Sequence, residues 1–372
     1  MRIGIDASRA FVDNPTGTER YSYEVITRIL KLPEAKKHTW ILYTRNSPPA
    51  AADPSLNLRE GRGVSYKIRR ISLPFFWTQL GLAWKTWVDD LDVLWVPAHT
   101  LPVLRKSGIR TVVTIHGIEY EWLPAYENLL QRWYLPLSTQ YAVHSASKII
   151  AVSQFTKKQL VEQLGAEESK ITVVHEGYTL PAQNSKLKTQ NYNLKPKTYL
   201  LFVGTVQPRK NLQRLIEAFA ILKTQYSELK LVIAGKLGWN YGRVVELAKK
   251  HGVIITGYIN EGDRYSLLRN ALVYVQPSIT EGFGLPVLEA MAAGVPVVSS
   301  SGGALEEIIG IQYSMSNKIL FDPFDIEDMV KKIGLVLNDK KLRENMIKEG
   351  LKMKFSWDEA AERTYRTLIS KL

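Results

Sequence analysis

The sequence predicts an α/β protein made of two doubly wound, Rossmann-like domains. Three observations support this fold class. Short, continuously apolar segments alternate with segments of helical periodicity along the chain, which is typical of parallel sheets covered by helices on both faces. A polar segment interrupts the alternation once, near the middle. The length of 372 residues suits two domains, because single domains seldom grow far beyond about 200 residues.

The predicted strands are short apolar runs rich in β-branched and aromatic residues. In the first half they are RIGID, TWILYT, VSYKIRRI, DVLWVPA, RTVVTIH, KIIAVS and KITVVHE. In the second half they are TYLLFVG, LKLVIAG, VIITGY, LVYVQPS, PVVSS and KILFDP. The intervening helices are amphipathic, and residues 211–222 illustrate the pattern, with Asn211 as the expected N-cap. The apolar face of that helix is predicted to consist of Leu212, Leu215, Ile216, Phe219 and Leu222.

The polar interruption defines the expected domains. Residues 179–197 lack periodicity and contain four lysines and no acids, as a linker would. We therefore expect domains at residues 1–178 and 198–355, with 356–372 a capped helix that packs back on the first domain. The carboxyl ends of both sets of strands should face a shared cleft, where ligands of such sheets bind.

Composition narrows the class of protein. The chain has no cysteine, which excludes disulfides and thiolate metal sites. The opening MRIGIDAS is expected to be a strand rather than a signal peptide, because Asp6 interrupts the apolar run. No apolar run approaches the roughly 18 to 20 residues that span a bilayer. We expect a soluble, cytoplasmic protein.

The formal charge of +13 is spread over the whole chain. Residues 1–178 contain 22 basic and 17 acidic side chains, and residues 179–372 contain 27 and 19. Because no basic stripe stands out, a nucleic-acid partner is not expected. A weak attraction to anionic membrane surfaces is consistent with this balance.

A basic turn follows the first strand of the second domain. In GTVQPRKN the strand ends at Gly204, and Arg209 and Lys210 stand side by side where the next helix begins. Free backbone N–H groups and two cations at one point suit a phosphate dianion. A solvated basic turn is the alternative, but the position at the carboxyl end of a strand favours phosphate binding.

Two glutamates eight positions apart flank a glycine turn in ITEGFGLPVLEAMAAG. The glycines let the backbone approach a ligand, so that the amides of Phe283, Gly284 and Leu285 can bind phosphate at the start of a helix. Glu289 lies one turn into that helix, within reach of ribose hydroxyls, and Glu281 stays in the loop. A helix-dipole role for Glu289 and a surface position for Glu281 would leave the glycine spacing unexplained.

The first domain has looser motifs. TGTER places Gly17 between the first strand and a helix, but it forms neither a G-x-G-x-x-G nor a Walker sequence. His116 ends the strand RTVVTIH and is expected at the cleft, although a lone histidine there is more often structural. There is no H-x-x-x-H spacing, and we expect no metal ion.

The segment LPFFWTQLGLAWKTWVDD is rich in tryptophan. Leu73, Trp77, Leu80, Trp84 and Trp87 recur at three- and four-residue spacing. Tryptophan at this spacing usually packs inward, so a core-facing helix is favoured. The alternative is an amphipathic helix that lies on a membrane and meets a lipid-linked acceptor.

Taken together, these motifs resemble those of the retaining glycosyltransferases of family 4, which have the GT-B fold. VGTVQPRKNLQRLIEAF and the stretch GYINEGDRYSLLRNALVYVQPSITEGFGLPVLEAMAAGVPVVSSSGGALEEIIG carry the specific part, with Glu281 and Glu289 as the E-x7-E signature. TGTERY and TIHGIEY match more loosely in the first half. The resemblance covers nearly the whole chain. It implies an acceptor-side first domain and a second domain that binds a nucleotide sugar.

The resemblance also implies a role for each matching residue of the second domain. Arg209 and Lys210 would bind the donor diphosphate, Glu289 the ribose and Glu281 the transferred sugar. The donor would also contact a further set of mainly backbone positions: Gly204, Tyr258 beside the base, Phe283, Gly284 and Leu285.

In the first domain, the resemblance places His116 at the sugar and Gly17 where phosphate and acceptor need room. Two positions depart from the family pattern. Glu19 stands where many members have glycine, and Gly117 stands where many have aspartate.

The implied activity is retaining, metal-independent transfer of a hexose of the mannose or glucose type from a GDP- or UDP-sugar. The acceptor would be a saccharide or a lipid-linked saccharide in cell-surface polysaccharide or glycoconjugate synthesis. Arg209 and Lys210 would replace a divalent cation, and front-face attack without a covalent intermediate would retain configuration. No cofactor is expected, and a peripheral contact at the inner membrane face is a further expectation.

Three alternatives to a transferase stay open. They are a GT-B nucleotide-sugar epimerase, a phosphorylase and a nucleotide-sugar-binding protein without catalysis. The presence of both Glu281 and the Arg209–Lys210 pair favours a transferase, and IAGKLGW resembles mannosyltransferase members of the family.

Overall fold

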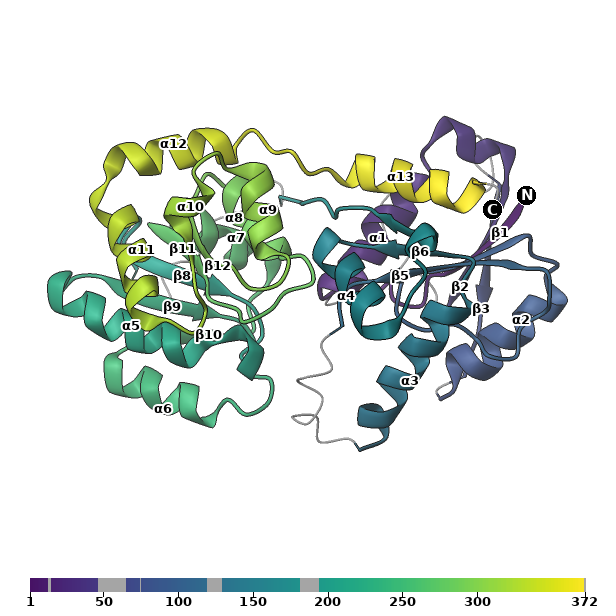
Figure 1. The fold of residues 1–372 in the computed structure, drawn as a ribbon, viewed down its shortest axis with the longest axis horizontal. Coiled ribbons are helices and arrows are strands. Elements are labelled where there is room, and N and C mark those ends of the chain that lie inside the picture. The colour runs from purple at the N-terminus through teal and green to yellow at the C-terminus, as the bar shows by residue number, and fades with distance from the viewer. Residues whose placement is uncertain (13–14, 46–64, 74, 119–128, 181–193, 371–372) are drawn as a thin grey trace. The chain divides into compact units, whose positions relative to one another are not determined.

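The computed structural model forms two compact units, drawn as ribbons in Figure 1. It describes residues 1–12, 15–45, 65–73, 75–118, 129–180 and 194–370. Unit 1 contains the described residues up to 177 together with 356–370, and unit 2 contains those from 178 to 355. Most of the linker expected at 179–197 lies outside the described residues.

Unit 1 is built on a parallel sheet. Its described strands have the order β3-β2-β1-β4-β5-β6-β7, and each neighbouring pair is parallel. The strands are β1 Arg2–Asp6, β2 Thr39–Thr44, β3 Tyr66–Arg70, β4 Val93–Val96, β5 Arg110–Ile115, β6 Lys148–Ala151 and β7 Ile171–Val173. The helices are α1 Gly17–Ile29, η1 Pro33–Lys37, η2 Trp77–Leu82, α2 Ala83–Val88, α3 Leu129–Ser145, α4 Gln154–Leu164, η4 Glu168–Lys170 and α13 Trp357–Ile369.

Unit 2 repeats the plan with the described strand order β10-β9-β8-β11-β12-β13, again parallel throughout. The strands are β8 Tyr199–Val203, β9 Lys230–Ala234, β10 Ile254–Gly257, β11 Val273–Gln276, β12 Val297–Ser300 and β13 Leu320–Phe321. The helices are η6 Pro208–Lys210, α5 Leu212–Gln225, α6 Gly242–His251, α7 Glu261–Asn270, α8 Leu285–Ala292, α9 Leu305–Gln312, α10 Ser316–Ile319, α11 Ile326–Asn338 and α12 Lys340–Gly350.

The predicted class of two Rossmann-like α/β domains is confirmed. Every strand segment expected from the sequence coincides with a strand of the structure. β4 and β8 are buried along their whole length, as central strands of a parallel sheet are when helices cover both faces. In unit 2, α5 packs against α6 and α11, whereas α8 packs against α7 and α12, so the helices form two separate layers.

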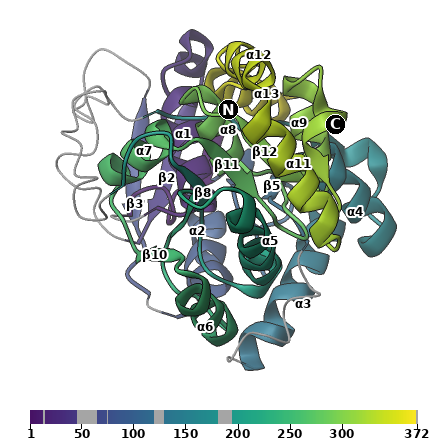
Figure 2. The same cartoon turned by 90° about the vertical axis from the view of Figure 1, so that its left-hand side faces the viewer.

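The strand order of unit 2 brings two distant segments together. β8 and β11 pair directly, with Val273 opposite Leu200, and they run side by side in both views (Figures 1 and 2). Because parallel strands end at the same edge of a sheet, the loops that follow β8 and β11 are neighbours. Those loops carry the basic turn and the glycine turn.

Helix α13 belongs to unit 1 although it ends the chain. It packs against α1, and Trp357 at its start is buried. Ser356 caps the helix by accepting a hydrogen bond from the backbone N–H of Asp358 at 3.1 Å. A methyl group on Gly177 would lie 2.1 Å from the backbone nitrogen of Trp357, so this glycine permits the close approach.

The tryptophan-rich segment departs from the favoured inward orientation. Trp77 is buried, but Leu80, Trp84 and Trp87 are exposed. The segment opens with the π-helix η2 and continues as α2. A π-turn holds more residues than an α-turn, so residues spaced three and four apart do not stay on one face. Of the five residues expected on a core-facing side, only Trp77 is buried, so the expectation was wrong for the other four.

Among the described residues, no helix combines the length and the apolarity that crossing a membrane requires.

Candidate active site

The loop after β8 begins with two glycines in contact. Gly204 has φ +156°, and a methyl group on Gly235, at the end of β9, would lie 2.0 Å from the carbonyl oxygen of Gly204. The two strand ends therefore approach more closely than side chains would allow. The chain then forms the short helix η6, which contains Arg209 and Lys210.

Asn211 occupies the N-cap position of α5, as predicted, but its side chain is used elsewhere. Its backbone is left-handed, with φ 57°, and its side chain makes no capping bond. The amide instead donates to the carbonyl oxygens of Pro277 at 3.0 Å and Pro323 at 2.6 Å. A buried amide in a left-handed position is a known use of asparagine, and here it ties the loops after β8, β11 and β13 together.

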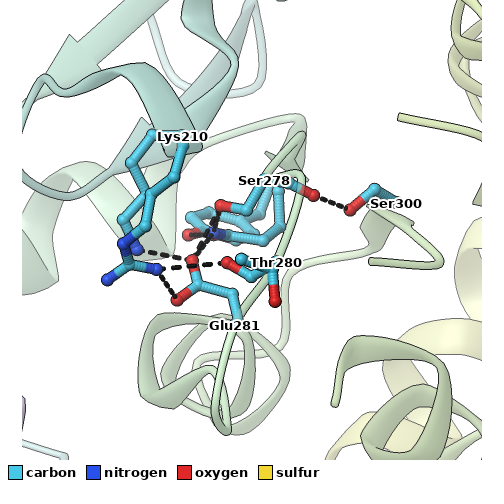
Figure 3. Close-up of polar contacts among 8 residues, drawn as sticks. Lys210, Ser278, Thr280, Glu281 and Ser300 are labelled. Atoms are coloured by element: carbon cyan, nitrogen blue, oxygen red, sulfur yellow. Dashed lines mark hydrogen bonds and ion pairs between the residues drawn. The ribbon is translucent and has the colours of Figure 1, made fainter. Parts of the chain in front are cut away.

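The two cations of η6 both bind Glu281. Nη1 of Arg209 lies 2.7 Å from Oε2, and Nζ of Lys210 lies 2.5 Å from Oε1, as Figure 3 shows for Lys210. Arg209 also donates to the carbonyl oxygen of Thr280 at 3.1 Å. All three side chains are largely buried. The residues predicted separately as phosphate and sugar contacts thus form one charged cluster, with two positive charges and one negative.

Polar side chains behind Glu281 complete its surroundings. Oε1 also accepts hydrogen bonds from Ser278 at 2.7 Å and from Gln276 at 2.9 Å. Gln276 in turn accepts one from the hydroxyl of Tyr274 at 2.5 Å. Among the described residues, Oε1 therefore accepts from three donors and Oε2 from Arg209 alone. Oε2 keeps capacity for a further donor, since a carboxylate oxygen accepts about two hydrogen bonds.

These contacts determine the charge state of the cluster. Burial by itself raises the pKa of Glu281, but the charges of Lys210 and Arg209 and the hydrogen bonds outweigh burial and lower it to about 2. Burial, together with the negative charge of Glu281, raises the pKa of the Tyr274 phenol well above its usual value. Glu281 is therefore ionised and Tyr274 is neutral at any ordinary pH.

A second loop, after β12, holds Glu281 from the other side. The hydroxyl of Ser300 donates to the carbonyl oxygen of Ser278 at 2.5 Å, a contact drawn in Figure 3. The N–H of Ala304 donates to the carbonyl oxygen of Glu281 at 2.8 Å. Methyl groups on Gly302 or Gly303 would overlap the backbone of residues 278–281. The sequence analysis missed these residues, although the SSSGG run gave a signal for them.

The glycine turn leads into α8 as predicted. Gly284 has φ +114°, and a methyl group there would lie 2.9 Å from the Leu305 side chain. Leu285 is the first residue of α8, with a proline in the first turn. Phe283 is buried edge-on against Phe355, with 5.8 Å between the ring centres. The first N–H groups of a helix have no partner within the helix, and phosphate binding at a helix N-terminus uses such groups.

Glu289 faces a cation that the sequence analysis did not single out. Its Oε2 lies 2.8 Å from Nη1 of Arg264 on α7, and Glu289 is buried. A buried carboxylate needs such a partner. Glu289 would therefore have to bind ribose while it is paired with Arg264. Tyr258, after β10, is exposed.

In unit 1, Gly17 opens α1 and is exposed. Glu19, which departs from the family pattern, has a structural function here. Its carboxylate accepts a hydrogen bond from the backbone N–H of Thr16 at 3.0 Å and lies 3.6 Å from Arg9. An acid in the first turn also complements the helix dipole.

His116 follows β5 and lies within a polar cluster of unit 1. Its Nδ1 is 3.0 Å from Oε1 of buried Glu176, and its Nε2 is 3.0 Å from the carbonyl oxygen of Pro97. Both neighbours are hydrogen-bond acceptors, so the two ring nitrogens of His116 are held between Glu176 and Pro97. Burial, with the charge of His116, lowers the pKa of His99 to about 3, and the neutral His99 ring accepts from the backbone N–H of His116 at 3.2 Å.

Within the described residues, no three His, Asp or Glu side chains are grouped so as to hold a metal ion.

Two parallel Rossmann-like units, with cations and an acid at adjacent strand ends in the second, define a glycosyltransferase of the GT-B class. Residues 15–180 match the model of "Glycosyltransferase Family 4", and residues 184–353 match that of "Glycosyl transferases group 1". O-antigen chain mannosyltransferase B of Escherichia coli is 30% identical over 267 residues, which cover 68% of this chain and 69% of that protein. The chain belongs to glycosyltransferase family 4.

Solved structures support the same fold. WaaG, a glycosyltransferase involved in lipopolysaccharide biosynthesis, superposes with a TM-score of 0.69 at 17% identity, over all of both chains. Alr3699/HepE of Anabaena, solved in complex with UDP and glucose, gives a TM-score of 0.70 at 17% identity and covers 100% of this chain and 99% of that one. At such low identity the likeness concerns the fold.

Proposed function

We propose that this protein is a retaining, metal-independent hexosyltransferase that uses a nucleoside diphosphate sugar. The observation that carries the proposal is the cluster of Arg209, Lys210 and Glu281 at the adjacent ends of β8 and β11. Two cations and one carboxylate leave a net positive charge, and the N-terminus of α8 adds to the positive potential. This is the potential that a diphosphate requires.

Arg209 and Lys210 would act on the leaving group. Breaking the anomeric C–O bond places negative charge on the diphosphate and positive charge on the sugar. Cations fixed in advance by Glu281 stabilise that charge separation more than they stabilise the bound donor. They would supply the charge that a divalent cation supplies in other transferases.

Glu281 is poorly suited to remove the acceptor's proton, because a carboxylate with a pKa of about 2 is a weak base. It is better suited to accept a hydrogen bond from a hydroxyl of the transferred sugar, through Oε2. The proton would then pass to an oxygen of the donor phosphate on the side from which the acceptor attacks. Front-face attack of this kind retains the anomeric configuration without a covalent intermediate.

Other predicted contacts complete the donor site. Glu289 would accept hydrogen bonds from the ribose while Arg264 holds its Oε2, and Tyr258 would lie beside the base. In unit 1, Gly17 would leave room for phosphate and acceptor. A contact of the His116 ring with the sugar would have to replace its hydrogen bond to Glu176 or to Pro97.

The transferred sugar is proposed to be mannose, or a hexose of the glucose type, carried by GDP or UDP. The mannosyltransferase relative supports mannose, and its O-antigen substrate supports a role in cell-surface polysaccharide synthesis. The acceptor would be a saccharide or a lipid-linked saccharide, which would place the enzyme at the inner face of a membrane.

A donor panel tests this proposal. Purified protein is heated with UDP, GDP, ADP and their sugars, and the donor that shifts the melting temperature is then assayed for transfer to saccharide acceptors. We expect one base to give a specific shift and EDTA to leave transfer intact. If no nucleotide or sugar nucleotide shifts the melting temperature, the proposed donor site is refuted. If EDTA abolishes transfer and Mg²⁺ restores it, the proposed metal independence is refuted. Epimerised free sugar would favour the epimerase, and binding without turnover would favour the non-catalytic binding protein.

A further inference from the structure

Unit 1 exposes large apolar side chains from three separate segments. We call them the aromatic surface and define it by Phe76, Trp84, Trp87, Leu104, Trp133 and Leu137, which are 71%, 66%, 57%, 74%, 74% and 62% exposed. Phe76 directly precedes η2, Trp84 and Trp87 lie in α2, Leu104 lies in the loop after β4, and Trp133 and Leu137 lie in α3; α2 and α3 are labelled in Figure 1. Single exposed apolar residues are ordinary, but contiguous patches mark interaction sites.

Hydrogen bonds show that the three segments adjoin one another. Gln79 of η2 donates to the hydroxyl of Tyr134 on α3 at 3.3 Å, and it accepts from the backbone N–H of Val103 at 2.9 Å. The indole N–H of Trp87 lies 3.4 Å from the carbonyl oxygen of Leu104. The exposed side chains therefore belong to one continuous face rather than to scattered positions.

Buried contacts fix which side of η2 and α2 points outward. The indole N–H of Trp77 donates to the carbonyl oxygen of Ile71 at 3.2 Å. A methyl group on Gly81 would lie 2.4 Å from the Ile71 side chain, so the helix sits directly on that residue. With Trp77 and Gly81 against the core, Trp84 and Trp87 are held outward by the fold.

Basic residues outnumber acidic ones in the sequence segments 65–92 and 101–109, which supply four of the six residues of the aromatic surface. The stretch from Ser65 to Val88 contains no acidic residue and four basic ones: Lys67, Arg69, Arg70 and Lys85. The loop at 101–109 adds Arg105 and Lys106, also without an acid. Lys106 lies 3.0 Å from Asp90, the nearest exposed acid in sequence. Lys85 stands between the two exposed tryptophans of α2 in sequence.

We propose that the aromatic surface inserts into the headgroup region of a membrane that contains anionic lipid. Tryptophan is enriched at membrane–water interfaces, because its ring is apolar and its N–H is polar. Basic residues beside such aromatics add attraction to anionic headgroups. Basic residues outnumber acidic ones in the segments 65–92 and 101–109, and this excess favours an anionic headgroup layer as the occupant.

Membrane binding would bring a lipid-linked acceptor to the surface of unit 1, which deepens the proposed function. The delivery of an acceptor rests on the proposed transferase activity, whereas membrane binding does not. Membrane binding itself can be measured without donor or acceptor. A nucleotide-induced thermal shift, measured without vesicles, tests the donor site separately. A protein that fails to bind membranes can therefore still show the nucleotide-induced shift, and the reverse also holds, so the two proposals are tested separately.

The test is vesicle flotation of the full-length protein. Vesicles of phosphatidylcholine alone are compared with vesicles that also contain phosphatidylglycerol, at low and at high salt. We expect flotation with the anionic vesicles at low salt, and a fall of roughly tenfold in the bound fraction for the W84S/W87S double variant and for W133S. Lys85→Glu should weaken binding to anionic vesicles only.

A matched control is Leu351→Ser, which removes a 57% exposed leucine of unit 2 and should leave flotation unchanged. Every variant should keep the melting temperature and the nucleotide-induced shift of the natural protein, which shows that unit 2 and the fold are intact. Absence of flotation, or flotation that W84S/W87S and W133S leave unchanged, would overturn the proposal. A dimer in solution that the same substitutions dissociate would overturn it in favour of a second copy of the chain.

Discussion

Gly303 lies directly against the backbone of Glu281: a methyl group added at Gly303 would be 2.5 Å from both the nitrogen and the carbonyl oxygen of Glu281. Gly303 also has φ +67°, where residues with a side chain are strained. The loop after β12 thus reaches the central acid of the site only because this position has no side chain.

Gly303→Ala should lower the free energy of unfolding by about 2 kcal/mol or more, because both the clash and the backbone conformation oppose it. Gly310→Ala is the matched control. Gly310 lies in α9, and a methyl group there meets nothing within 4 Å, so alanine should stabilise the helix by about 0.5 to 1 kcal/mol. Denaturant unfolding measures both, and equal effects of the two substitutions would contradict this account of the loop.

Lys210→Ala and Arg209→Ala should each lower kcat by about 100- to 1,000-fold, because each removes a cation aimed at the leaving diphosphate. Arg243→Ala is the control, since Arg243 is an exposed arginine of α6 that pairs with neighbouring Glu246. Steady-state transfer kinetics give the effect, and circular dichroism checks the fold. Rates within about twofold of the natural enzyme for both cation variants would refute the assignment.

The contacts to ribose and to diphosphate can be separated by ligand. Glu289→Ala should weaken binding of the nucleoside diphosphate by about tenfold or more, but leave binding of inorganic pyrophosphate nearly unchanged. Lys210→Ala should weaken both. Isothermal titration calorimetry measures the four affinities. A loss of pyrophosphate binding in Glu289→Ala would mean that Glu289 acts through the loop rather than on the ribose.

Removing Arg264 is expected to destabilise the fold, because it takes away a cation that lies 2.8 Å from a buried carboxylate. The Arg264→Ala/Glu289→Gln double variant should therefore be more stable than Arg264→Ala alone. Thermal unfolding of the two proteins decides this, and a double variant that is no more stable would show that the ion pair has little energetic weight.

Glu281 should make stability depend on pH in a defined direction. Its pKa falls from 4.5 in the unfolded chain to about 2 in the folded protein, so the folded state binds the proton less well. The resulting stabilisation, on the order of 3 kcal/mol, is present above pH 4.5 and is lost as the pH falls toward 2. Comparison with Glu281→Gln isolates it: the difference in free energy of unfolding should be constant from pH 7 to about 5 and shrink below that. If that difference in free energy of unfolding instead grows as the pH falls, the predicted direction of the pH dependence is wrong.

The strands and the class of fold were predictable because they depend on local pattern. Continuous apolar runs specify buried parallel strands whatever surrounds them. The E-x7-E pair and the Arg–Lys turn were also visible, since each is a short contiguous motif. The ion pairs between them were not foreseen, because they join residues 71 and 72 positions apart in the chain. Only the strand order, in which β8 and β11 are neighbours, reveals that contact.

Other predictions failed where long-range contacts override local preference. Asn211 lies at the N-cap position as predicted, but its side chain makes no capping bond: its amide N–H groups donate to two distant loops and its Oδ1 accepts from Arg214. Trp84 and Trp87 fit an inward helical face by spacing, but the π-turn at η2 changes the phase. Arg264 gave no signal of its own, since nothing in the sequence around it indicates that it faces Glu289.

Because α13 is part of unit 1 but follows unit 2 in the sequence, unit 1 cannot complete its folding until α13 has been synthesised. The surface of α1 against which it packs is made early, from residues 17–29, whereas α13 follows the whole of unit 2 in the sequence. During translation, the apolar side of α1 stays open until Trp357 and the residues after it leave the ribosome. A nascent chain lacking those residues would present that side to chaperones, and a stop codon just before Ser356 would remove an internal part of the first unit rather than a tail.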